Sequence, residues 1–226
     1  MSRQSLSVLS MVTLVTLLAT LAPHAADPAP PDPKTISIAE ARSLPLGTVV
    51  TVDGSVTVPS GAFASSAALE QGFAIQDHTG GIWVSARDNL GFAPRQQVRV
   101  TGRLSDSVLP GLLVLVDPTD IKAHPSGPKV QALPVDTGAV GEATEGKLVR
   151  ITGTITQPIV NDLPFGFIIV VDDGSGDVHS FVAASTGIDV SGLSQGQTIE
   201  VTGFSGQFAG NFEVDPRFQS DITILP

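Results

Sequence analysis

The sequence predicts an all-β protein made of two small closed barrels in tandem. The first reason is a strand pattern in which apolar and polar residues alternate around a glycine. It occurs four times, at residues 50–56, 98–104, 149–156 and 199–203. Alternation with a period of two indicates a strand with one face in a core. A glycine inside such a strand marks a bulge or a sharp bend, as at the corner of a barrel. The second reason is a repeat that covers most of the chain.

The repeat divides the chain into two similar halves. Residues 47–57 align with residues 146–156 without a gap, and residues 72–75 (Gly-Phe-Ala-Ile) align with residues 166–169 (Gly-Phe-Ile-Ile). Each copy is expected to hold five short strands and a brief pairing segment at its end. The predicted segments are a signal peptide at 1–26, a proline-rich linker at 27–34, the first repeat at 35–125, a second linker at 126–131 and the second repeat at 132–226.

The N-terminus has the features of a signal peptide. Arg3 supplies a positive charge, residues 6–21 are mostly apolar, and Ala22, Ala25 and Ala26 follow near a plausible cleavage point. A retained membrane anchor is the alternative, but the run is short for a span and rich in threonine and serine. We therefore expect a secreted or periplasmic mature protein with no membrane span once the signal is removed.

Composition limits the chemistry that is available. The chain has no cysteine, which excludes disulfides and thiolate metal sites. Its formal net charge of -10 disfavours a general polyanion binder, because such proteins carry a basic surface. The charge is uneven: residues 34–128 hold seven Lys and Arg against eight Asp and Glu (7 - 8 = -1), whereas residues 129–226 hold four against twelve (4 - 12 = -8).

The elements of each repeat follow one order. A lead-in comes first: Ser37 and Glu40 form a capping box that predicts one or two helical turns, and residues 137–143 are a weaker, glycine-interrupted version. A long bent strand follows, and then a hairpin whose turn is residues 77–80 or residues 173–176. A second glycine-bent strand and a last strand complete the unit. The connections at residues 88–94 and 185–194 are short, so we expect irregular structure or one helical turn in each.

This order resembles the oligonucleotide/oligosaccharide-binding (OB) fold. The resemblance is carried by the glycine-bent first strand, the hairpin of strands two and three, and a fourth strand of Val-x-Val-x-Gly type. Four segments make the resemblance more specific, because they are similar to OB domains of secreted bacterial proteins. Such domains are often appended to extracellular nucleases and other hydrolases. The segments are residues 36–42, 46–50, 73–77 and 172–176. It implies two tandem five-stranded OB-fold (Greek-key) barrels. It also implies ligands on the face of strands two and three, between the loops named L12 and L45. The sequence contains no catalytic domain of the kind found in the nucleases.

No motif predicts an enzyme. The sequence lacks a nucleophile elbow, a zinc-protease motif and a P-loop, and His78, His124 and His179 show no pairing in their spacing. Only a triad assembled in space is left open. Residues 172–177 lack the alternating ligands and the terminal Glu of a calcium loop, so a polar hairpin turn is the favoured interpretation. We expect a non-enzymatic protein without a metal or a cofactor.

Trp83 is the first candidate for a binding residue. Ile82 and Val84 are expected to point into the first barrel, so Trp83 and Ser85 point out, and an outward Trp can stack on a base or a sugar. The alternative is an aromatic side chain that caps the barrel or the interface between the repeats. His179 takes the equivalent place in the second repeat. The L12 loops are predicted at residues 59–71 and 157–164, the L45 loops at residues 105–111 and 205–211, and Phe73 and Phe167 in the cores.

A row of basic and polar residues on the fourth strand of the first repeat is the second candidate. Alternate residues of this strand share the outward parity, lie about 6.5–7 Å apart and could follow a phosphate backbone; they are Arg95, Gln97, Arg99, Thr101 and Arg103. The alternative is a solvated, aggregation-resistant strand face. The second repeat carries Glu200 where Arg99 stands. The full set of candidate nucleic-acid contacts is Trp83, Gln76, Ser85, Arg87, Arg95, Gln97, Arg99 and Arg103.

Two functional hypotheses remain. One is a module that binds single-stranded nucleic acid through the first repeat, with a separate secreted enzyme as a candidate partner. The other is an adaptor or scaffold at the cell exterior that binds a protein or a glycan. A basic surface beside an exposed Trp83 favours the first hypothesis. A continuous acidic surface with Trp83 buried between the repeats favours the second.

Overall fold

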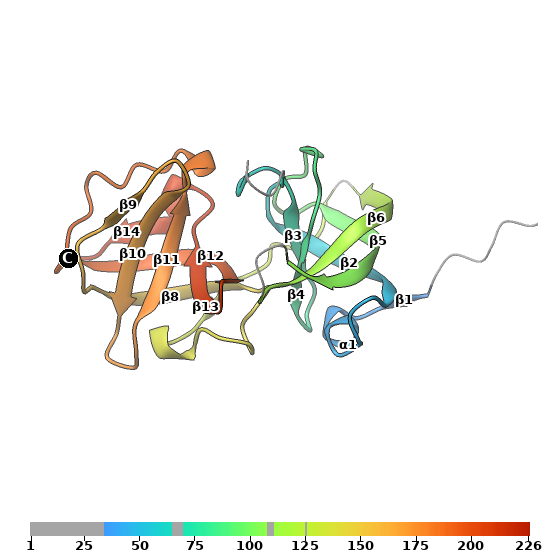
Figure 1. The fold of residues 1–226 in the computed structure, drawn as a ribbon, viewed down its shortest axis with the longest axis horizontal. Coiled ribbons are helices and arrows are strands. Elements are labelled where there is room, and N and C mark those ends of the chain that lie inside the picture. The colour runs from blue at the N-terminus through green and yellow to red at the C-terminus, as the bar shows by residue number, and fades with distance from the viewer. Residues whose placement is uncertain (1–33, 65–69, 108–110, 125) are drawn as a thin grey trace, which may run out of the picture. The chain divides into compact units, whose positions relative to one another are not determined.

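The computed structural model describes residues 34–64, 70–107, 111–124 and 126–226. The predicted signal peptide and residues 27–33 of the predicted linker lie outside the described residues, as do parts of the L12 and L45 loops of the first repeat. The described chain forms two closed β-barrels, coloured blue to green and yellow to red in Figure 1. No helix in the described residues is long and apolar enough to cross a membrane.

The first barrel consists of five main strands and a short lead-in. Its sheet has the order β1-β2-β3-β4-β6-β5, and β5 pairs back with β2, which closes the barrel. The elements are β1 (Thr35–Ile36), α1 (Ile38–Arg42), β2 (Val49–Val58), β3 (Phe73–Gln76), β4 (Gly81–Val84), β5 (Gln97–Asp106) and β6 (Leu113–His124).

The second barrel repeats this plan. The path β8-β10-β11-β13-β12 closes through pairing of β12 with β8. Short strands β7, β9 and β14 and three 3-10 turns add to it. The elements are β7 (Leu133–Pro134), η1 (Thr137–Ala139), β8 (Leu148–Ile155), β9 (Val160–Asp162), β10 (Gly166–Asp172), β11 (Val178–Ala183), η2 (Ala184–Thr186), β12 (Thr198–Phe208), β13 (Asn211–Asp215), η3 (Gln219–Asp221) and β14 (Ile222–Ile224).

The topology confirms the predicted fold class. In each barrel the third and fifth main strands pair in parallel, β4 with β6 and β11 with β13. The other pairs of main strands are antiparallel. This is the strand order of two OB-fold barrels. In the described residues, α1 is the one α-helix, and it is five residues long.

Glycine lets the first strand of each barrel turn the corner. Residues 49–55 of β2 pair with β5, and residues 55–58 pair with β3, so β2 changes partner just after Gly54. A Cβ atom on Gly54 would lie 3.0 Å from the backbone nitrogen of Gln76. In β8 the equivalent Gly153 faces the backbone of Asp172, and its Cβ would lie 2.8 Å from the carbonyl carbon. Both glycines are therefore required by close approach of the next strand, as the bend pattern predicts.

Each barrel has its own apolar core. The first contains Val52, Phe73 and Ile82, all fully buried. The second contains Ile151 and Ile199, also fully buried. Each of these two cores lies inside its own barrel, and a third cluster, which includes Trp83 and Phe204, joins the barrels.

The hairpin turn of each barrel holds the lead-in segment. Ser37 caps α1 by accepting from the backbone N–H of Glu40 at 3.2 Å, as the capping box predicts. Asp77 accepts from the backbone N–H of Ile38 at 2.9 Å, and Asp173 accepts from that of Thr137 at 3.1 Å. The two repeats therefore match in their hydrogen bonds as well as in their strands.

The last loop of the second repeat differs from its prediction. L45 was expected at residues 205–211, but β12 runs to Phe208 and only Ala209 and Gly210 form the turn, both with positive φ. Gly206 was interpreted as a loop residue, but it lies buried within the strand, where it pairs with Glu213. The L12 loop of this repeat also contains β9, which pairs with β10.

Candidate ligand-binding cleft

An aromatic cluster joins the two barrels, and Trp83 lies at its centre. The indole ring is 5.6 Å from the ring of Phe204, between centroids, and stacks on Phe63 at 6.0 Å. Trp83 points away from the core of the first barrel, as predicted, but only 6% of it is exposed. It is therefore no open stacking platform, because Phe63 and Phe204 cover it. The position of Trp83 agrees with the alternative interpretation, in which it is an aromatic residue at the interface between the repeats.

Glu70 fixes the indole and the strand beside it. Its Oε1 accepts from Nε1 of Trp83 at 3.3 Å and from the backbone N–H of Ala86 at 3.0 Å. Its Oε2 accepts from the hydroxyl of Ser85 at 2.6 Å. Ser85, a predicted ligand contact, therefore holds the wall of the junction in place.

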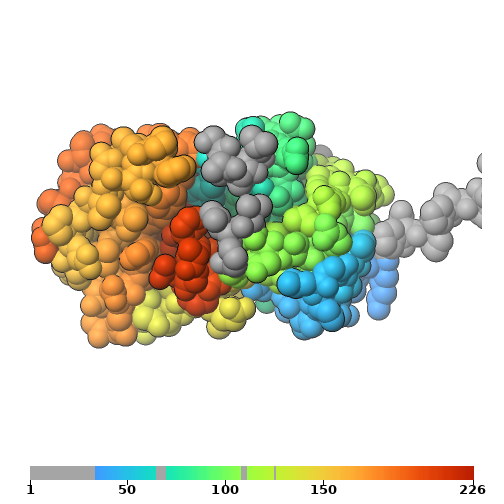
Figure 2. Space-filling view, in the orientation of Figure 1, coloured from blue at the N-terminus to red at the C-terminus, as the bar shows by residue number. Residues whose placement is uncertain are grey.

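Polar contacts fasten the barrels to each other. Arg42 donates to Glu145 at 2.7 Å. Gln76, another predicted ligand contact, accepts through Oε1 from the backbone N–H of Leu148 at 2.8 Å. Arg217 donates to the backbone carbonyl of Thr57 at 2.6 Å. Red atoms of the last part of the chain lie against green atoms of the first barrel in Figure 2. Gln76 thus serves the junction rather than an open surface.

The predicted row of basic residues is largely neutralised. Arg99 donates to Asp53 at 2.8 and 3.0 Å, because the two residues stand opposite each other on β5 and β2. Arg103 pairs with Asp117 at 2.5 Å. Arg95 was expected on the same strand face but precedes β5 and has φ 74°, so the row is interrupted there.

The remaining candidates lie apart from one another. Gln97 begins β5 and accepts from the hydroxyl of Ser55 at 3.0 Å. Arg87 is exposed in the connection after β4. The structure therefore does not bring the eight candidates together into one basic surface.

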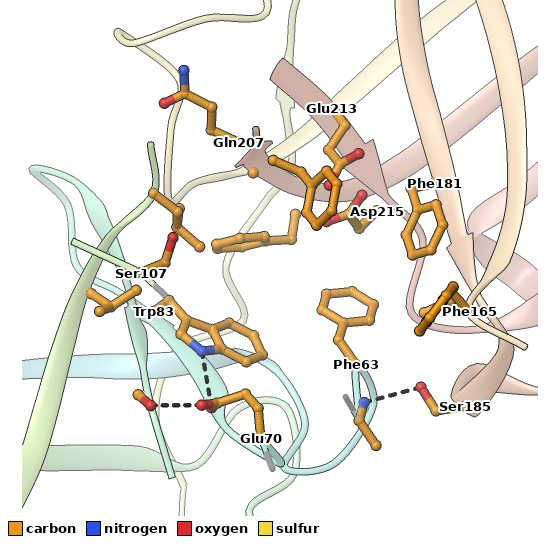
Figure 3. Close-up of a pocket in the computed structure, with 18 of the residues that line it drawn as sticks. Phe63, Glu70, Trp83, Ser107, Phe165, Phe181, Ser185, Gln207, Glu213 and Asp215 are labelled. Atoms are coloured by element: carbon orange, nitrogen blue, oxygen red, sulfur yellow. Dashed lines mark hydrogen bonds between the residues drawn. The ribbon is translucent and has the colours of Figure 1, made fainter. Parts of the chain in front are cut away.

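A cleft of about 940 Å³ opens at the junction of the barrels (Figure 3). Its volume lies within the usual range for ligand sites, about 300–1,000 Å³. Both barrels contribute aromatic side chains to its wall. Phe165 and Phe208 are 55% and 49% exposed, so they are open to a ligand. The aromatic residues that line the cleft are Phe63, Trp83, Phe165, Phe181, Phe204 and Phe208.

The second barrel presents its OB ligand face to this cleft. Ile169, Val182 and Val214 point into the core. Strand alternation then turns the residues beside them outward, toward the cleft. They are Ile168 on β10, His179 and Phe181 on β11, and Glu213 and Asp215 on β13. His179, the predicted counterpart of Trp83, thus does lie at the site.

The described lining of the cleft is acidic. It contains one arginine, which is the Arg103 already paired with Asp117, and one histidine. The six carboxyl groups are those of Glu70, Asp106, Asp117, Asp162, Glu213 and Asp215. The carboxylates of this wall would repel a polyanion, but they would not repel a neutral or cationic ligand.

Two of these carboxyls share one face of β13, where Glu213 is half-buried and Asp215 is buried. Burial raises the pKa of Glu213 to about 7. Burial, and then the charge of Glu213, raise the pKa of Asp215 well above its ordinary value. Asp215 is 8% exposed, and its Oδ1 has no hydrogen-bond partner among the described residues. Perturbed carboxyls of this kind are typical of functional sites.

Sequence reasoning missed this carboxyl pair for a physical reason. The alternation of β13 shows that Glu213 and Asp215 share one face, but an outward acidic residue is normally solvated. The burial of Asp215 depends on contacts with β12, a separate stretch of the chain, and no local pattern reveals them. Within the described residues, no group of three or more His, Cys, Asp or Glu is arranged to hold a metal ion.

Comparison with solved structures finds matches of low sequence identity, three of which are described here. No family model matches the chain, and neither does any curated protein. A murine DNA-binding protein bound to double-stranded DNA matches at 10% identity and a TM-score of 0.38, over 73% of this chain and 90% of that chain. The complex of fission yeast Pot1 with single-stranded DNA matches at 9% and 0.35, over 81% and 85%. A replication protein A heterotrimer bound to single-stranded DNA matches at 14% and 0.33, over 82% and 51%. Similarity at this level carries no argument about the ligand, and the fold assignment rests on the strand order.

Proposed function

We propose that the protein is a non-enzymatic OB-fold binding protein of the cell exterior, and that the cleft between its barrels binds a glycan. One observation carries the proposal: the OB ligand face of the second barrel combines aromatic rings with carboxyl oxygens in a single cleft. The signal-like residues 1–26 support a secreted or periplasmic location. The lack of a catalytic motif supports a binding role.

A glycan matches both features of the cleft. The C–H face of a sugar ring packs on an aromatic ring, and Phe165, Phe181 and Phe208 offer such rings. Sugar hydroxyls donate hydrogen bonds, and the carboxyls of Asp162 and Glu213 are acceptors. A sugar also lacks the phosphate charge that the acidic wall would repel.

Single-stranded nucleic acid is the second candidate. The aromatic rings on the OB face favour it, because bases stack on such rings regardless of sequence. Binding through the first repeat, as the sequence suggested, would have to uncover Trp83. It would also have to compete with Asp53 for Arg99. The partner would then be a nucleic acid rather than a glycan or a surface protein.

Calorimetric titration of residues 27–226 with neutral oligosaccharides and with single-stranded DNA separates the two candidates. We expect a neutral hexasaccharide to bind with little dependence on salt. We expect Phe181→Ala to weaken it about tenfold, or about 1.4 kcal/mol. Phe218→Ala is the matched control, because Phe218 is exposed but does not line the cleft. Salt-sensitive binding of DNA without binding of any glycan would overturn the proposal.

A further inference from the structure

Asp215 is the exception among the buried carboxylates of the described chain. The other two each have an arginine: Glu145 accepts from Arg42 at 2.7 Å, and Asp221 from Arg217 at 2.9 Å. Asp215 has no cationic partner in the described residues, and its nearest charged neighbour on β13 is another carboxyl, Glu213. A buried, unpaired carboxyl is costly in free energy, so the arrangement calls for a partner from outside.

Asp215 lines the cleft, where an outside partner could reach it. Its strand neighbour across β12 and β13 is Phe204, whose ring lies in the cleft wall. A Cβ atom on Gly206 would lie 3.1 Å from Oδ2 of Asp215 and 3.4 Å from the ring of Phe204. The glycine therefore lets the carboxyl of Asp215 and the ring of Phe204 lie close to β12, where even a methyl group would crowd them. Figure 3 shows Asp215 and Glu213 among the residues that line the cleft.

We propose that Glu213 and Asp215 bind the ammonium group of an amino sugar, so that the cleft prefers glycans with free amines. This proposal rests on the proposed function and names its ligand class. An ammonium group has three donors, and it can bridge two carboxyls that point the same way from one strand. Phe181 and Phe204 line the same space, and aromatic faces attract a cation.

The charges that face the pair favour a cation. His179 stands opposite Glu213 on the neighbouring strand β11. Arg103 lines the far wall but is held by Asp117. The remaining charged groups of the described lining are the carboxyls of Glu70, Asp106 and Asp162. Glu70 is held by Trp83 and Ser85, and among the cleft carboxyls of the described residues Asp215 is the one with a buried oxygen that lacks a hydrogen-bond partner.

The test compares two probes that differ only in the amine: a glucosamine hexamer and its fully N-acetylated form. Affinities for residues 27–226 are measured by calorimetry near neutral pH. We expect the free amine to bind at least about tenfold tighter, which corresponds to about 1.4 kcal/mol. Asp215→Asn should remove this preference and leave binding of the acetylated hexamer nearly unchanged. Gly206→Ala should also reduce the preference, because it fills the space beside the carboxyl.

Glu200→Gln is the matched control, because it removes one carboxylate from the same barrel outside the cleft, and it should keep the preference. A damaged fold would weaken both hexamers, whereas a lost amine site changes only their ratio. Equal binding of the two hexamers by the native protein would overturn the inference and keep the proposed function. Binding of neither hexamer would overturn both. Tighter binding of a pentalysine peptide than of the amine hexamer would assign the pair to a protein ligand and overturn the amino-sugar assignment.

Discussion

Arg42 of the first barrel donates to Glu145 of the second at 2.7 Å, and only 1% of the Glu145 side chain is exposed. Glu145 also accepts from the backbone N–H of Leu113 at 3.2 Å. One buried carboxylate therefore ties together the lead-in helix, the last strand of the first barrel and the second barrel. Because the cleft lies at the same junction, its shape depends on this contact.

Arg42→Ala should destabilise the protein strongly, because it leaves the Glu145 charge buried without a partner. Breaking a buried pair in this way costs about 3–5 kcal/mol in the free energy of unfolding. Arg150→Ala is the control: its pair with Glu200 is exposed and 3.7 Å long, so we expect a loss below about 1 kcal/mol. Urea denaturation measures both. Equal losses would show that the Arg42–Glu145 pair does not hold the barrels together.

Gly153→Val should destabilise the second barrel by about 1–3 kcal/mol through overpacking and strain. The reason is the backbone of Asp172, which leaves no room for a Cβ atom at residue 153. Gly192 has open space around it, so Gly192→Val serves as the control and should change thermal stability little. An unchanged melting temperature for Gly153→Val would mean that β8 does not bend against β10 at this point.

The carboxyl pair of the cleft should make stability fall as pH rises. The pKa of Glu213 is raised from 4.5 to about 7, so its contribution to stability is complete below pH 4.5 and is lost as pH rises through about 7. Asp215, whose pKa is also raised, acts in the same direction. Glu213→Gln should therefore be more stable than the native protein above about pH 7, by about 1–3 kcal/mol, and should lose this advantage toward pH 4.5. Denaturation curves across this range that run parallel for the two proteins would contradict the burial of Glu213.

Asp77 should have the opposite pH dependence. Burial raises its pKa, but hydrogen bonds from the N–H of Ile38 and from Thr79 and Gly80 outweigh burial and hold the pKa below its usual 3.8. The contribution of Asp77 is therefore present above pH 3.8 and is lost as pH falls below it. Asp77→Asn should cost about 1–3 kcal/mol at neutral pH, because it weakens the hold on the lead-in helix. The difference from the native protein should shrink in acid. Asp88→Asn, in an exposed loop, is the control.

The fold was accessible from the sequence because its determinants are local. The alternation around Gly54 and Gly153, the capping box at Ser37 and the turn beginning at Asp77 each act within a few residues. Because the same signals recur in the second half of the chain, the sequence predicts two barrels. The same residues position the helix and the strands in the structure.

The site was less accessible because it depends on contacts between residues far apart in the chain. The alternation of the strand correctly predicts that Trp83 points out of the barrel. The ring of Phe204, which covers Trp83, comes from the other repeat. The basic row included Arg99, whose partner Asp53 stands opposite on another strand, so its neutralisation required the register of β2 and β5. Asp215 is a candidate because its side chain is buried, and the alternation of residues on its strand does not predict that burial.

The fluorescence of Trp83 tests the central claim most directly. It is the only tryptophan of the chain and lines the cleft, so its emission reports on this site alone. Titration of residues 27–226 with a hexasaccharide should give a saturable change in emission. Phe181→Ala should shift that change to higher concentrations, whereas Phe218→Ala should not. Unchanged Trp83 emission with every glycan, together with quenching by single-stranded DNA, would contradict the assignment of the cleft to a glycan.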